Sequence, residues 1–132
     1  VFGRLVAERI LQLTEAQSRE TIDVWELGAG RGHLAHDVLA AFEELREEAV
    51  QRGDQAQAAR LAGARYHAIE SDRRALEEQR ERNRRWLKAG SLELIPEDAA
   101  AYLAGHGFTN VRSLRGGIDA WSQEIDSLLP RY

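Results

Sequence analysis

Hydrophobic and polar positions along this chain of 132 residues follow two different periods. Long stretches have apolar residues every three or four positions, which is typical of amphipathic helices that cover a core. Short apolar runs bounded by turn residues lie between them and are typical of strands. The pattern predicts helices at about 1–16, 32–50, 55–63, 73–88, 97–105 and 117–128, and strands at about 21–27, 65–70, 91–95 and 111–114.

The predicted strands and helices alternate along the chain. Alternation of this kind favours parallel βα units joined by right-handed crossovers. We therefore expect one α/β domain over residues 1–132, a three-layer Rossmann-like sandwich with about four parallel strands.

A glycine-rich turn follows the first predicted strand, in the segment Glu26-Leu27-Gly28-Ala29-Gly30-Arg31-Gly32. Glycines at alternate positions let the backbone turn sharply and approach a ligand closely. The N–H groups that begin the following helix then point toward the bound molecule. The same glycines could serve only to close a tight strand–helix turn, and the turn by itself leaves both interpretations open.

An acidic residue, Glu70, ends the second predicted strand. An acid at this position can accept hydrogen bonds from both ribose hydroxyls of a nucleotide. Ser71 or Asp72 could instead cap the next helix, and both roles can hold together. The interval between Gly32 and Glu70 exceeds the ~20 residues of a dinucleotide-binding unit, which argues against a dinucleotide enzyme.

Three segments together resemble the MidA-like methyltransferases: residues 1–8, the turn at 26–32, and Tyr66-His67-Ala68-Ile69-Glu70. The resemblance covers about residues 1–88 and includes the long insert between turn and acid. It implies a class I fold, S-adenosylmethionine as cofactor and protein arginine methylation as activity. It also implies that Glu26, Gly28, Gly30 and Gly32 line the methionine end of the cofactor and that Glu70 holds its ribose. Ala29 belongs to the same candidate cofactor-binding set.

The segment from about residue 98 to 132 resembles the last part of a rhodanese domain, through residues 99–111, 114–121 and the ending Pro130-Arg131-Tyr132. Rhodaneses carry sulfur on a cysteine persulfide. The chain has no cysteine, so this sulfur-transfer chemistry is excluded.

Asp98 is the last candidate cofactor residue. In methyltransferase-like folds an acid after the third strand can accept the adenine amino group, and the resemblance nominates Asp98 for this role. An acid here also favours the first turn of a helix through the helix dipole, without any ligand.

Composition narrows the remaining choices. A net charge of −4 does not favour nucleic-acid binding, no apolar run is long enough for a membrane span, and the histidines lack metal-ligand spacing. The absence of cysteine fits the expectation of a cytoplasmic protein, because disulfides are rare in that compartment. Because the chain lacks methionine and residue 1 already lies in an apolar helix pattern, we expect a fragment, a processed product or an engineered chain.

Two functions are compatible with these features of the sequence. The first is an S-adenosylmethionine-binding, methyltransferase-like domain without a complete acceptor site, acting on a protein substrate. The second is a non-catalytic α/β module, degenerate, fused or engineered, with a rhodanese-like tail. The sequence assigns no catalytic residue and no oligomeric state.

Overall fold

The computed structural model describes residues 2–108 of the chain. The chain divides into two compact units, Val1–Glu97 and Asp98–Tyr132, and each is considered by itself. The first unit contains α1 (Phe2–Ala16), β1 (Asp23–Leu27), α2 (His33–Gln51), α3 (Gln55–Ala62), β2 (Arg65–Ile69), α4 (Arg73–Arg82), α5 (Arg84–Ala89) and β3 (Leu92–Ile95). The described part of the second unit contains α6 (Ala99–Gly105).

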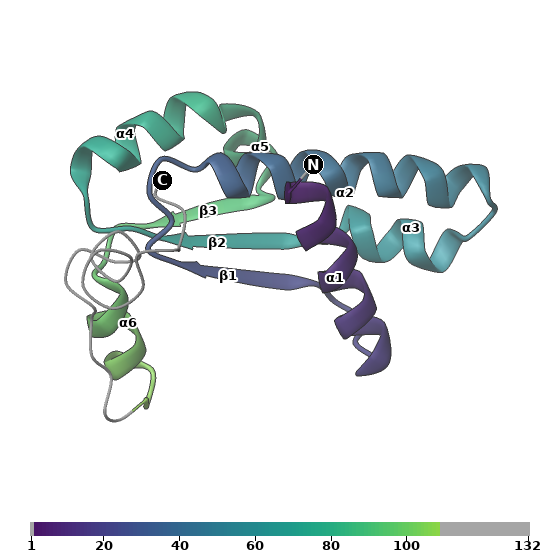
Figure 1. Ribbon diagram of the computed structural model, residues 1–132, viewed down its shortest axis with the longest axis horizontal. Coiled ribbons are helices and arrows are strands. Elements are labelled where there is room, and N and C mark those ends of the chain that lie inside the picture. Colours follow the sequence, from purple (N-terminus) through teal and green to yellow (C-terminus); the bar gives the residue numbers. More distant parts are fainter. Residues whose placement is uncertain (1, 109–132) are drawn as a thin grey trace, which may run out of the picture. The chain divides into compact units, whose positions relative to one another are not determined.

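The described strands form a parallel sheet in the order β1-β2-β3. Trp25 pairs with His67, which in turn pairs with Glu93. Sequential parallel strands need a helical crossover between them, and α2 to α5 supply these connections. Helices α2, α4 and α5 lie on one side of the sheet, as Figure 1 shows. The carboxyl ends of the strands therefore meet at one edge, and the glycine turn leaves β1 there.

The core of the first unit lies between the sheet and α2. It includes Val38 and Phe42 from α2, Tyr66 and Ala68 from β2, and Leu92 from β3. Helix α1 adds Ala7 and Leu11 to this core, with Val6 and Ile10 packed against it. The apolar spacing of the helix also marks Phe2, Leu5 and Leu13 as buried, and this expectation is wrong, because all three are exposed. Burial of these apolar side chains, at roughly 25 cal/mol per Å² of apolar surface, is the main contribution to the stability of the first unit.

The expected helices and strands within residues 2–105 are confirmed, with boundaries that differ by one or two residues. One expectation was wrong: the helix predicted at 73–88 is broken at Asn83 into α4 and α5. Asn83 has φ −110° and ψ 21°, outside the helical region, although its backbone N–H still donates to the Gln79 backbone carbonyl. The periodicity continues across the break and conceals it.

The sheet face opposite α2 is half exposed on β1, where Trp25 and Leu27 show 50% and 46% of their surface to solvent. Trp25 is thus not a core residue. Its ring stacks on His67 with centroids 4.0 Å apart. Residues 2–97 form a sheet of three strands with helices on one of its faces. These are two layers of the expected three-layer sandwich. The predicted strand at 111–114 and helix at 117–128, with Trp121, lie outside the described residues.

Candidate functional site

The glycine turn is tied to the end of β2 by its backbone. The N–H groups of Gly28 and Ala29 both donate to the Ile69 carbonyl, at 2.9 and 3.0 Å. These bonds continue the β1–β2 ladder into the turn and fix where it leaves the sheet. The residues predicted on two separate segments, Gly28 to Gly32 and Glu70, are thereby brought to one edge.

Gly30 and Gly32 need glycine for different reasons. Both have positive φ, 60° and 81°, a region that costs other residues about 1–2 kcal/mol. A Cβ added at Gly30 would meet nothing within 4 Å, so the space beside it is open. A Cβ at Gly32 would lie 2.6 Å from Asn83 Nδ2 and 2.7 Å from Gln79 Cγ. Gly30 therefore faces a space that a ligand can enter, whereas Gly32 is packed against α4.

Glu70 lies next to this open space and is half buried. Its Oε2 accepts a hydrogen bond from the Gly30 N–H at 2.7 Å, and its Oε1 accepts one from the Asp72 N–H at 2.7 Å. Asp72 caps α4 by accepting from the Ala75 N–H, which leaves Glu70 free of the capping role. The role of Glu70 toward a ribose stays a prediction. The Glu70 side chain is oriented by these two backbone donors.

Glu26 is oriented by Tyr66, a residue that the sequence pattern did not single out. The Tyr66 hydroxyl donates to Glu26 Oε2 at 2.7 Å, and Tyr66 is 1% exposed. Burial raises the pKa of Glu26, the Tyr66 hydrogen bond partly lowers it, and the negative charge of Glu70 raises it further. Burial and the neighbouring Glu26 charge also raise the pKa of Tyr66, so its hydroxyl remains a donor.

Helix α2 begins directly after the turn. Gly32 is its N-cap residue, in the left-handed region, and no side chain caps the first turn by a hydrogen bond. The first N–H groups of a helix carry a partial positive charge and favour anionic or strongly polar ligand atoms. The turn thus places backbone donors and two carboxyl groups at one edge of the sheet.

Two polar residues of α4 and its C-cap, behind the turn, were also missed. Gln79 and Asn83 are fully buried, and their amide groups donate to the carbonyls of Gly30 and Gly32. Their spacing offered a signal, because Leu76, Gln79 and Asn83 occupy one face of a helix at intervals of three and four. Arg82 on α4 also donates to the turn, at the Arg31 carbonyl.

Asp98 belongs to the second unit, where it caps α6. Its side chain accepts from the Ala101 N–H at 3.0 Å. This contact agrees with the ligand-free interpretation of the acid at the start of a helix. The role of Asp98 toward adenine stays a prediction.

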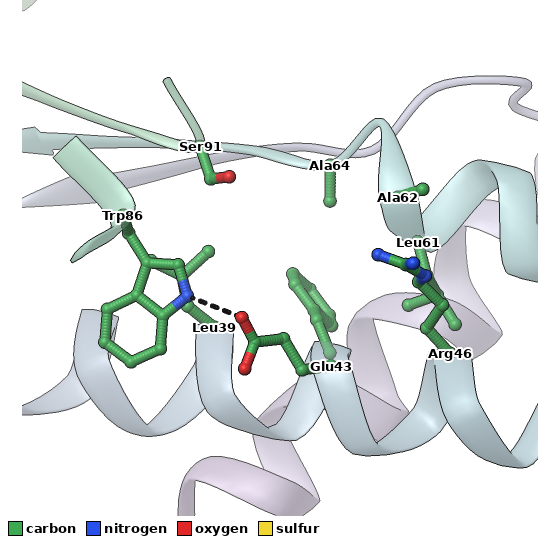
Figure 2. Close-up of a pocket in the computed structure, with 9 residues that line it drawn as sticks. Leu39, Glu43, Arg46, Leu61, Ala62, Ala64, Trp86 and Ser91 are labelled. Atoms are coloured by element: carbon green, nitrogen blue, oxygen red, sulfur yellow. Dashed lines mark hydrogen bonds between the residues drawn. The ribbon is translucent and has the colours of Figure 1, made fainter. Parts of the chain in front are cut away.

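A second hollow lies at the opposite, amino edge of the sheet, near the residues that precede β2 and β3. Figure 2 shows Trp86 and Glu43 next to each other in its lining, with a hydrogen bond of 3.2 Å from the indole N–H to Glu43 Oε1. Its volume is about 70 Å³, well below the ~300–1,000 Å³ of pockets that hold drug-sized ligands. It is too small for a nucleoside-sized cofactor.

Residues 2–108 contain no group of three or more acidic or histidine side chains that could hold a metal ion. None of the helices in that range is long and apolar enough to cross a membrane.

Comparison with known proteins adds to this geometry. Residues 3–108 match a protein family described as "putative S-adenosyl-L-methionine-dependent methyltransferase". The chain belongs to this family. The matched range includes the glycine turn, Glu70 and the α4 residues behind the turn.

A short segment of 34 residues is 50% identical to the protein "Adenylyltransferase and sulfurtransferase UBA4" of Candida albicans. This segment is 26% of the chain but only 8% of that protein. No solved structure matches the chain.

Proposed function

We propose that the chain binds S-adenosylmethionine at the carboxyl edge of its sheet and serves as the cofactor-binding part of a methyltransferase. The observation that carries this proposal is the contact between Glu70 and the Gly30 N–H, 2.7 Å long, beside open space at Gly30. It joins the two parts of a nucleoside site, a glycine turn and a ribose-binding acid.

The hydrogen-bonding capacity of Glu70 fits a ribose. An ionised carboxylate offers about four lone-pair positions, and the Gly30 and Asp72 N–H groups use two of them. The others can accept the two ribose hydroxyls without displacing either backbone donor. Because these two backbone donors already orient the Glu70 side chain, binding would remove little of its conformational entropy.

The environment of Glu26 suits the methionine end of the cofactor. Its half-buried carboxyl group is held by Tyr66, and burial raises its pKa. A nearby positive charge would offset this effect and favour the ionised form. The amino group of the cofactor would supply such a charge. Bound S-adenosylmethionine supplies a methyl group on a sulfonium, and the transfer depends mainly on positioning the acceptor in line.

The finer assignment, to a MidA-like enzyme that methylates arginine in a protein, rests on the resemblance of residues 1–8, 26–32 and 66–70. Recognition of an arginine side chain requires residues that bind the methyl acceptor, and we assign none of these among residues 2–108. The proposed protein substrate therefore follows from resemblance alone.

Sulfur transfer is not part of the proposal. The name of the Candida albicans protein includes a sulfurtransferase, but the chain has no cysteine to carry sulfur as a persulfide. We expect no transfer of sulfur from thiosulfate to cyanide.

Isothermal titration calorimetry with S-adenosylmethionine and S-adenosylhomocysteine tests the proposal. We expect one site per chain, and we expect Gly30→Val to abolish binding because its side chain would fill the open space. Circular dichroism checks that this variant keeps its fold. The non-catalytic alternative is favoured if neither compound binds the folded wild-type protein.

A further inference from the structure

We infer that Gln79 and Asn83 position the glycine turn for the cofactor by holding its carbonyl side from behind. The inference deepens the proposed function and rests on it. Gln79 Nε2 donates to the Gly30 carbonyl at 2.6 Å, and Asn83 Nδ2 donates to the Gly32 carbonyl at 3.0 Å. We call these two residues the amide clamp.

The clamp acts on the backbone that makes the site. A peptide group directs its N–H and carbonyl in opposite directions, so a fixed carbonyl also fixes the N–H of the next residue. Holding the Gly30 and Gly32 carbonyls therefore constrains the Arg31 N–H and the His33 N–H at the start of α2. Gly30 is held from the other side as well, since its own N–H donates to Glu70.

The amide clamp supplies the hydrogen-bond donors that the carbonyl groups of the turn require. A carbonyl can only accept a hydrogen bond, so the amide nitrogens, not the oxygens, must face the turn. The amide oxygens Gln79 Oε1 and Asn83 Oδ1 then have no hydrogen-bond partner within the described residues. A buried polar atom without a partner destabilises the fold, and an apolar side chain would avoid this cost.

Fixation of the turn has a direct consequence for binding. Three positive-φ glycines would otherwise give this segment large conformational freedom, which a ligand would have to remove. The clamp and Glu70 remove it during folding. Gly32 completes the arrangement, because only a residue without Cβ fits against Asn83 Nδ2 and Gln79 Cγ.

The test compares Gln79→Met, which has similar shape without the donor, with Phe42→Leu as a matched control. Phe42 lies in the core on α2, nine residues beyond the start of the helix or about 13 Å along it. Asn83→Leu serves as a second clamp variant if Gln79→Met does not fold. All are made in the full chain.

Two measurements are made on each variant: amide hydrogen exchange by NMR without ligand, and the Kd for S-adenosylhomocysteine. For Gln79→Met we expect the Gly30 and Gly32 amides to exchange about tenfold faster than in the wild type, measured relative to Tyr66 and Ala68 in β2, and Kd to rise about tenfold, the effect of losing one hydrogen bond. Phe42→Leu should accelerate all four amides together and leave Kd nearly unchanged.

The inference is overturned if Gln79→Met leaves the exchange of the turn unchanged, or if the turn and β2 accelerate equally. Unchanged Kd with a loosened turn would overturn the effect on binding. If the wild type binds no cofactor, the proposed function fails, and hydrogen exchange still decides whether the clamp orders the turn.

Discussion

The two edges of the sheet differ in what their polar side chains bind. At the carboxyl edge, the buried amide clamp and half-buried Glu70 bond to the backbone of the glycine turn. At the amino edge, exposed Glu43 bonds to other side chains, namely Arg85 at 2.9 Å and Trp86 at 3.2 Å. Arg85 also lies over the Trp86 ring, 4.4 Å from its centroid.

This difference supports the proposed position of the ligand site. Exposed ion pairs contribute about 0–1 kcal/mol and can be replaced with little effect. Buried polar side chains that hold a backbone segment in one conformation are costly to bury and serve mainly to fix geometry. The carboxyl edge is therefore the edge that we propose as the ligand site, and the amino edge is a surface contact between helices and strand ends.

The largest effect is expected at Gly32. Gly32→Ala combines positive-φ strain with overpacking against Asn83 and Gln79, so it should lower the free energy of unfolding by about 2–5 kcal/mol. Gly30→Ala meets no atom within 4 Å and should cost only about 1–2 kcal/mol of strain. Urea denaturation measures both, and equal losses would contradict the distinction between a packed and an open glycine.

Glu70→Ala comes next and should affect both folding and binding. The variant loses the acceptor for the Gly30 and Asp72 N–H groups, which should lower stability by about 1–3 kcal/mol. Affinity for S-adenosylhomocysteine should fall by a similar free energy. Glu47→Ala, an exposed acid on α2, is the control and should change neither. A folded Glu70→Ala protein with wild-type affinity would remove Glu70 from the site.

The raised pKa of Glu26 predicts opposite pH effects on stability and on binding. Because its folded-state pKa lies above the ordinary value of about 4.3, Glu26 contributes stability below that pH and loses it as pH rises through the raised pKa. Ionised Glu26 attracts the amino group of the cofactor, so affinity should rise over the same interval. Glu26→Gln should remove both slopes in denaturation and calorimetry series, and unaltered slopes would assign them to other groups.

The smallest effect is expected at the amino edge. Glu43→Gln keeps an acceptor for the Trp86 N–H but removes the charge that pairs with Arg85. Stability should change by about 0–1 kcal/mol, and cofactor affinity should not change. A loss of affinity as large as that of Glu70→Ala would show that the two edges are not independent.

The sequence predicted the parallel α/β arrangement from periodicity, and the family resemblance assigned the glycine turn and Glu70 to one cofactor. It did not predict the break at Asn83, since the apolar spacing continues through it. Tyr66, Gln79 and Asn83 were missed because their hydrogen bonds join segments at least 40 residues apart. Such contacts depend on the packing of α4 and β2 and leave only a weak local signal.

Chemical-shift mapping with S-adenosylhomocysteine tests the central claim most directly. In an assigned NMR spectrum of the full chain, we expect the backbone amides of Gly28, Gly30, Gly32 and Glu70 to shift on titration. The amides of Ala64 and Ser91, which line the hollow at the amino edge, should stay in place. Shifts confined to the amino edge, or no shifts at saturating ligand, would contradict a cofactor site at the glycine turn.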